Sequence, residues 1–213
     1  MERILAIIKF GKEEHINDLV RNGVLYLNPL SYFKKSDNDD FRRDNLEGIS
    51  GLFQADGAIL KMEIDDKFQN VAEIRGSIKF HDFIDGPKVN LYCLHLFRES
   101  HIETLVDKLN LEFNDTFVAF KNGDVFLNQI REGIRKAGFK FKEGDVIYQD
   151  YSKYSGKLNL FHKSDKYKYQ SEYRFVVYSN STNPIKITIG DLSNFSIVGP
   201  TSDLNRRIRI VNS

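Results

Sequence analysis

The amino-acid sequence predicts an α+β fold in which strands outnumber helices. Short runs of β-branched and aromatic residues recur along the whole chain, whereas apolar residues take helical spacing in two segments, 12–23 and 123–138. The 213 residues include four prolines and no low-complexity tract, so no linker is indicated. We therefore expect a single domain over residues 1–213, built from two packed or split sheets with a few peripheral helices.

The start of the chain predicts a strand, a helix and a second strand. RILAIIKF (3–10) is a short Ile-rich run of the kind found in buried strands. The segment after it has helical spacing and ends at Asn22-Gly23, a favourable C-terminal cap. Its apolar positions are Ile16, Leu19 and Val20. VLYLN (24–28) then predicts a strand that Pro29 closes.

The remaining elements are predicted mostly as strands. Residues 49–64 predict a hairpin with Asp56-Gly57 as its turn. Residues 116–138 predict a strand, an Asn122-Gly123 turn and a helix, with apolar positions at Val125, Phe126, Ile130 and Ile134. Further strands are expected at 73–83, 88–97, 145–151, 157–163, 173–179 and 185–189, with one or two more in the tail.

Composition and missing motifs exclude several classes of protein. With 41% hydrophobic residues the chain can bury a core, and its net charge of +1 gives no general attraction to nucleic acid. A lone cysteine, Cys93, forms no internal disulfide and fits a reducing compartment. The histidines lack zinc-ligand spacing, and neither a GxGxxG nor a Walker pattern occurs. Without a membrane-length apolar run or a signal-peptide pattern, we expect a cytoplasmic protein with no metal site and no membrane partner.

The stretch YKYQSEYRFVVYS (167–179) carries the first candidate for chemistry. If the strand alternates from Lys168 onward, Gln170, Glu172 and Arg174 share one face, while the face with Phe175 belongs to the core. Glu172 and Gln170 then point together into a cleft or into solvent. One interpretation is a catalytic carboxylate; the other is a surface ion pair in which Arg174 partners Glu172.

Two further segments carry candidate binding residues. Residues 31–48 combine aromatic side chains with Arg42 and Arg43, whose guanidinium groups suit bidentate recognition of a diphosphate; the alternative is a solvated loop. Between Tyr148 and Tyr178, tyrosines alternate with lysines, a composition that stacks bases and neutralises phosphates. Tyrosines are also favourable strand residues, so this second pattern stays open.

In order along the chain, these features resemble the ADP-ribosyltransferase superfamily, especially its compact bacterial toxin and defence branch, which includes enzymes that modify DNA or RNA. The resemblance rests on IIKF, EEHINDLVRNG, VLYLNPLSYF and DDFRRDNLEG early in the chain, and on LFHK, SDKYKYQ and SEYRFVV late in it. It covers residues 4 to about 180. It implies a split β-sandwich that holds NAD, as substrate, in the cleft between its halves.

The resemblance also implies roles for individual residues. Glu172 would hydrogen-bond the ribose beside the breaking nicotinamide bond, and Gln170 would orient the acceptor. Tyr32 and Phe33 would stack on nicotinamide, and Arg42 or Arg43 would contact the diphosphate or the acceptor. In the superfamily a His or Arg of the first strand donates to the adenosine ribose of NAD. This chain has Lys9 there as a substitute donor, and His95 is a further candidate donor.

The sequence therefore supports three functional hypotheses. The first is an NAD-dependent mono-ADP-ribosyltransferase, an intracellular toxin or antiphage effector that modifies an RNA or DNA base or, alternatively, a protein, and that is held in check by an antitoxin or inhibitor protein. The second is a non-catalytic module that binds nucleic acid or protein. The third is an NAD glycohydrolase in which water replaces the acceptor.

Overall fold

The computed structural model describes residues 2–35, 44–56, 59–73, 77–83, 88–112 and 115–209. The first half of the chain contains β1 (Ile4–Gly11), α1 (Glu13–Asn22), β2 (Val24–Pro29), α2 (Leu30–Lys35), β3 (Ile49–Asp56), β4 (Ile59–Ile64), β5 (Lys67–Glu73), β6 (Ser77–Phe83) and β7 (Asn90–Arg98). The second half contains α3 (Lys108–Leu111), β8 (Thr116–Phe120), α4 (Gly123–Lys136), β9 (Lys140–Asp145), β10 (Ile147–Gln149), β11 (Gly156–Lys157), β12 (His162–Ser164), β13 (Glu172–Tyr178), β14 (Ile185–Thr188), β15 (Ser196–Pro200) and α5 (Leu204–Arg207). Short 3₁₀ helices lie at Glu99–His101, Asp165–Gln170, Ser193–Phe195 and Thr201–Asp203. The fold is α+β, as the sequence predicts, and its strands are mostly antiparallel.

The main sheet has eight strands and divides at β7. One edge of β7 pairs with β13, which continues to β9. The other edge is shared, because β1 pairs with β7 near His95 and β2 pairs with it near Leu91. From there β2 continues to β14, and β1 continues to β8 and β15. The sheet therefore opens along one edge of its central strand.

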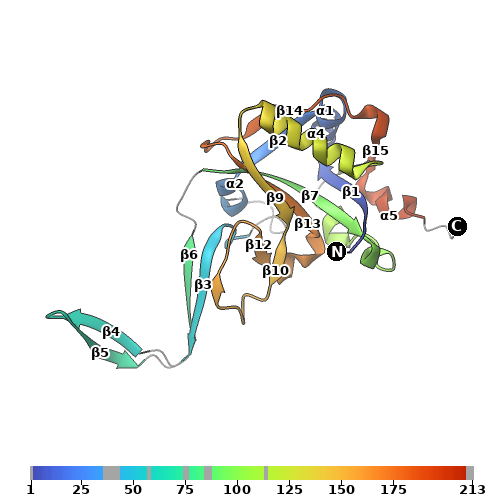
Figure 1. Cartoon of the computed structure of the whole chain (residues 1–213). Coiled ribbons are helices and arrows are strands. Elements are labelled where there is room, and N and C mark those ends of the chain that lie inside the picture. The colour runs from blue at the N-terminus through green and yellow to red at the C-terminus, as the bar shows by residue number, and fades with distance from the viewer. Residues whose placement is uncertain are drawn as a thin grey trace.

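Two amphipathic helices, α1 and α4, cover one face of this sheet (Figure 1). Gly23 ends α1 in the left-handed conformation, as predicted, and a Cβ there would meet the carbonyl oxygen of Gly190 at 1.9 Å. Asn122 caps the start of α4 by accepting a hydrogen bond from the Val125 amide at 3.1 Å. The predicted apolar positions of α1 and α4 are buried, except that Val125 is exposed and Leu127 is buried instead.

The predicted hairpin over residues 49–64 is wrong. β3 pairs with β6, and β4 pairs with β5 through a turn at Asp65 and Asp66, both of which have positive φ. Aspartate tolerates this conformation better than most residues, which explains why a turn forms there without glycine. The two-stranded β4–β5 sheet lies at the far end of the β3–β6 pair, away from the main sheet (Figure 1).

In the described part of the chain, no helix has both the length and the apolar character that a membrane crossing needs.

Candidate functional site

A pocket opens where β1 and β2 separate from the edge of β7. β1 leaves β7 after Ile8, and β2 joins it at Asn28, so the β7 residues between Leu91 and His95 have no strand partner on that edge among the described residues. Lys9 reaches into this gap and donates from Nζ to the carbonyl oxygen of Cys93 at 2.8 Å. The same ammonium lies 4.8 Å from the centre of the Tyr92 ring. The division of the sheet therefore exposes backbone of the central strand to the pocket.

The pocket has a volume of about 510 Å³, within the range of small-molecule sites. It brings together residues that are far apart in the sequence. Its lining includes the predicted site residues Lys9, Tyr32, Phe33, Gln170 and Glu172. The other two predicted binding residues, Arg42 and Arg43, lie outside the described residues.

Glu172 is the first residue of β13, and Gln170 is the last residue of the preceding 3₁₀ helix. The prediction that one alternating strand carries both residues is therefore wrong. Ser171 between them has φ of 40° and ψ of 54°, and its hydroxyl donates to the carbonyl oxygen of Leu96 at 2.8 Å. This left-handed residue turns the chain sharply, which is how a helical glutamine and a strand glutamate come to line the same pocket.

A buried network of charges holds Glu172 in place. Nε of Arg174 donates to Glu172 Oε1 at 2.8 Å. Nη1 of Arg174 donates to Glu47 Oε1 at 2.6 Å and to the carbonyl oxygen of Leu160 at 2.6 Å. Nζ of Lys163 lies 3.5 Å from Glu172 Oε2 and 3.7 Å from Glu47 Oε2. Two cations thus stand between two carboxylates, and all four side chains are buried.

The interpretation of Glu172 as a surface ion pair is correct about its partner and wrong about its exposure. Arg174 does partner Glu172, but their side chains are only 1% and 6% exposed. Burying an ion pair requires that its remaining hydrogen-bonding groups be satisfied, and Glu47, Lys163 and the Leu160 carbonyl do this here. Such a network fixes the orientation of the Glu172 carboxylate, which a solvent-exposed pair would not do.

The network keeps Glu172 ionised. Burial alone would raise the pKa of Glu172, but the Arg174 guanidinium and the Lys163 ammonium hold it well below its usual range. Burial likewise opposes charge on Lys163, yet the carboxylates of Glu172 and Glu47 raise its pKa above the ordinary value. Glu172 is therefore an ionised carboxylate that lines the pocket, and its charge is balanced within a network of two cations and two carboxylates.

Asp44 is a third buried carboxyl beside this network. Burial, and then the charge of Glu47, raise its pKa to about 6. Its Oδ1 accepts a hydrogen bond from the Leu46 amide at 2.9 Å, and its Oδ2 is buried with no partner among the described residues. An oxygen without a donor is easily protonated, which agrees with the raised pKa.

Cys93 and Tyr148 complete the surroundings of Glu172. The Cys93 thiol hydrogen-bonds to the Glu172 carboxylate, and burial raises the pKa of that thiol far above its usual value. The Tyr148 hydroxyl accepts a hydrogen bond from the Glu172 amide at 3.0 Å. Cys93 is therefore an un-ionised donor to the carboxylate and not a nucleophile.

His95 lines the pocket in a defined tautomer. Its Nδ1 lies 2.8 Å from the carbonyl oxygen of Gln170, so Nδ1 carries the hydrogen and donates. Burial lowers the pKa of His95 to about 4, so the ring is neutral and Nε2 can only accept. Nε2 is buried and has no partner among the described residues. The prediction of His95 as a donor to a ligand is thus wrong, because its one hydrogen is already used.

Cationic and aromatic side chains line the rest of the pocket. Tyr32 and Phe33 come from α2 and meet edge to face, with ring centres 5.4 Å apart. His15, from α1, stacks on Tyr26 of β2 at 5.9 Å. Lys12, which precedes α1, also lines the pocket. One pocket thus combines a fixed carboxylate with cationic groups and exposed aromatic faces.

The predicted tyrosine and lysine surface is only partly on the outside. Lys163 belongs to the buried charge network, and Tyr151 is buried beneath β3 and β11. The exposed lysines of this segment are Lys153, Lys157, Lys166 and Lys168. The alternation of residue types could not separate these two groups, since it does not say which lysine faces inward.

Sequence reasoning missed two central residues, Glu47 and Lys163. Glu47 lies in a polar stretch typical of a solvated loop and is buried by contact with Arg174, 127 positions away. Lys163 ends the predicted strand 157–163, within the predicted tyrosine and lysine surface, yet it is buried against Glu172 and the distant Glu47. The only local signal at Glu47 is the following Gly48, whose φ of +74° marks a required turn. In the described part of the chain, no three His, Cys, Asp or Glu side chains come together in a way that could hold a metal ion.

Comparison with known proteins gives no match to this chain, whether among family models, curated proteins or solved structures.

Proposed function

We propose that this protein is an NAD-dependent mono-ADP-ribosyltransferase with a split β-sandwich fold. The observation that carries the proposal is the ionised, buried carboxylate of Glu172, which lines a pocket together with Lys9, Tyr32 and Phe33. These residues come from separate parts of the sequence and line the same pocket, which supports the proposal.

The proposed role of Glu172 is electrostatic stabilisation of the transition state. The bond between C1′ of the ribose and the nicotinamide nitrogen breaks, its electron pair leaves with nicotinamide, and positive charge develops on the ribose. A carboxylate already held by Arg174 and Lys163 needs no reorientation to stabilise this charge. Glu172 Oε2 lies at a long 3.5 Å from Lys163 Nζ, and a carboxylate oxygen can accept more than one hydrogen bond, so it retains capacity to accept a ribose hydroxyl.

The other residues bind and orient. Tyr32 and Phe33 offer ring faces for nicotinamide, and Lys9 and Lys12 offer positive charge for the diphosphate. Gln170, fixed by Lys163 Nζ at 2.7 Å, orients the acceptor. Attack of the acceptor nucleophile on C1′ forms the new glycosidic bond, and the acceptor loses its proton to solvent.

We propose a nucleic-acid base as acceptor, and a toxin or antiphage role that an antitoxin or inhibitor protein restrains. The support is the exposed set of Lys153, Lys157, Lys166 and Lys168 on the segment that leads to Gln170. Half-buried tyrosines of the same segment, Tyr154, Tyr167 and Tyr169, give base-stacking surface beside them. A protein acceptor, and hydrolysis of NAD by water, are the alternatives within the same chemistry.

One observation favours a different class, a non-catalytic binding module. The Glu172 carboxylate already has Arg174, Lys163 and Cys93 as partners, which is the arrangement of a structural ion network. A binding module would take up a ligand in the pocket and release no nicotinamide.

The test is release of nicotinamide from NAD by the purified chain, measured by chromatography with single-stranded RNA, single-stranded DNA, protein or no acceptor present. We expect release that Glu172→Gln reduces by at least about a hundredfold, as removal of one transition-state group does elsewhere. Glu143→Gln is the control, because Glu143 pairs with Arg131 on the far side of β13. Intact mass then identifies which acceptor gains one ADP-ribose. NAD binding without release under every condition would favour the binding module.

A further inference from the structure

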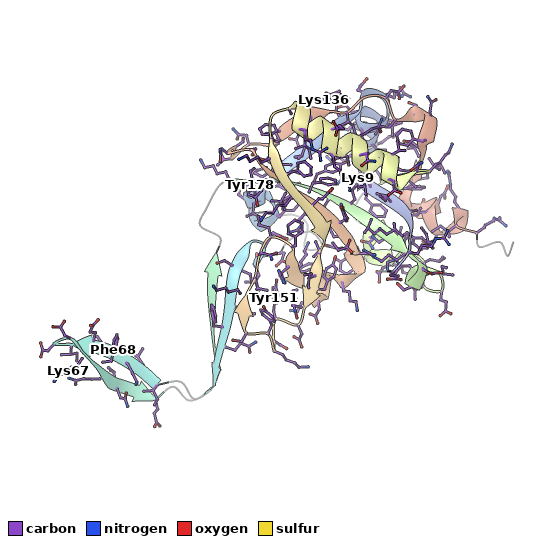
Figure 2. All side chains as sticks on the ribbon, in the orientation of Figure 1. Lys9, Lys67, Phe68, Lys136, Tyr151 and Tyr178 are labelled. Carbon is purple, nitrogen blue, oxygen red and sulfur yellow. The ribbon has the colours of Figure 1, made fainter. Side chains whose placement is uncertain are left out.

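The β4–β5 hairpin, residues 59–73, exposes every one of its side chains. Figure 2 shows Lys67 and Phe68 on this hairpin, remote from Lys9 in the body of the protein. Phe68 is 70% exposed, and Leu60, Met62 and Ile64 are each more than 40% exposed. A two-stranded hairpin is marginally stable alone in water, and exposed apolar side chains on it indicate a binding surface.

The two faces of the hairpin differ. Leu60, Met62 and Ile64 alternate along β4, so they share one face and make it apolar. Lys61 and Glu63 lie on the opposite face. The strand therefore carries an apolar row on one face, and on the other it carries Ile59 followed by a positive and a negative charge.

The two edges of the hairpin differ as well. On β5, Ala72 pairs with Leu60 and Asn70 pairs with Lys61, so Val71 is an extra, bulged residue. A bulge interrupts the hydrogen-bonding edge of a strand and discourages further pairing. β4 has no such interruption, and among the described residues it pairs with β5 alone. The regular edge of β4 is thus open to another strand.

β4 is complementary to itself in one antiparallel register. When two copies of β4 lie side by side with Met62 opposite Met62, Lys61 of each copy faces Glu63 of the other. In the same register Leu60 of each copy faces Ile64 of the other, on the apolar face. Cross-strand pairs of opposite charge and of apolar side chains are the ones that stabilise antiparallel sheets. A two-fold axis through Met62 satisfies both sets at once.

We propose that the β4 edge is a self-association site, where a second copy of this chain pairs to form a four-stranded sheet in the order β5–β4–β4–β5. The match of charges fits a second copy residue by residue. It does not favour nucleic acid, since residues 59–73 contain two lysines against four acidic residues. The site is independent of the enzymatic activity proposed above.

The test is sedimentation velocity of the full chain from about 1 to about 100 μM, the range in which a weak dimer dissociates. We expect the wild type to dimerise. Lys61→Glu alone and Glu63→Lys alone should each weaken the dimer at least about tenfold, because each sets like charges opposite one another across the axis. An equimolar mixture of the two variants should dimerise like the wild type, because each charge then meets its opposite.

Two results would overturn the proposal. One is a wild type that stays monomeric across the range. The other is a dimer that both single variants leave unchanged. The β5 edge supplies matched controls, Lys67→Glu and Glu73→Lys, which should leave the dimer intact because that edge is bulged. All four positions are exposed strand residues, so we expect folding to be retained, and circular dichroism checks this.

Discussion

Nη1 of Arg174 lies 2.6 Å from Oε1 of Glu47, a residue 127 positions away in the sequence. Arg174 also holds Glu172, two residues before it on β13. One guanidinium therefore ties the segment before β3 to the strand that carries the candidate catalytic carboxylate. The stability of the fold and the geometry of the pocket depend on the same side chain.

We predict that Arg174→Met destabilises the protein by about 3 kcal/mol, because among the described residues it leaves the buried Glu47 and Glu172 with Lys163 alone as a cationic partner. Urea unfolding at pH 7 measures this change. Arg206→Met is the control, since Arg206 is 83% exposed and lies 4.0 Å from Asp203. Its substitution should cost under about 0.5 kcal/mol. Equal effects of the two substitutions would mean that the buried network contributes nothing to stability.

Asp44 should make the native state more stable as the pH falls from 7 to 4. Its pKa is about 6 in the folded protein against 3.8 for an ordinary aspartate, so the native state binds the proton first on acidification. Asp44→Asn keeps the oxygen that accepts from Leu46 and removes the titration. Between pH 7 and pH 4 the wild type should gain on the order of 2 kcal/mol over this variant. A difference in unfolding free energy that does not change with pH would contradict the raised pKa.

His95 should act in the opposite direction over nearly the same range. Its pKa is about 4 in the folded protein against 6.5 for an ordinary histidine, so the unfolded chain binds the proton first and acid destabilises the native state. His95→Asn keeps a donor near Gln170 and removes the titration. We expect the wild type to lose on the order of 2 kcal/mol against this variant between pH 7 and pH 4. Titration of His95 by NMR near pH 6.5 would refute this expectation.

The elements with a periodic apolar pattern could be predicted from the sequence, and the charge network could not. Ile16, Leu19 and Val20 define a helix by their spacing alone, and the left-handed cap at Gly23 follows from local chemistry. The burial of Glu47 depends on Arg174, 127 positions away, and the burial of Lys163 depends on Glu47 and Glu172. No local sequence pattern predicts such a contact, because the cost of removing a charge from water is offset by a partner elsewhere in the chain.

The predicted hairpin over residues 49–64 is also wrong because contacts between distant residues decide the structure there. Asp56-Gly57 is a good turn by composition, and the apolar arms on both sides fit a hairpin. β3 nevertheless pairs with β6, more than twenty residues away. Its other edge pairs with β11, so the three strands form one sheet. Short-range turn propensity was overridden by pairing between distant strands. Glu172 could be nominated from its strand, but the sharp turn at Ser171 that separates it from Gln170 could not be foreseen.

Gly48 lies between Glu47 of the buried charge network and the start of β3. Its φ is +74°, and a Cβ there would lie 2.7 Å from Cδ2 of Leu30. Gly48→Ala therefore adds a steric clash to backbone strain, and we expect it to destabilise the protein by about 3 kcal/mol. Gly138→Ala is the matched control, since Gly138 has φ of +79° and open space around it, and strain alone should cost about 1 kcal/mol. Relief of the clash would move the Leu30 side chain, whereas relief of the backbone strain would shift Glu47, the neighbour of Gly48 and the partner of Arg174. Nicotinamide release should consequently fall in Gly48→Ala and stay at the wild-type level in Gly138→Ala, when both are assayed well below their melting temperatures. Equal stability and equal release in the two variants would show that the segment before β3 does not position the site.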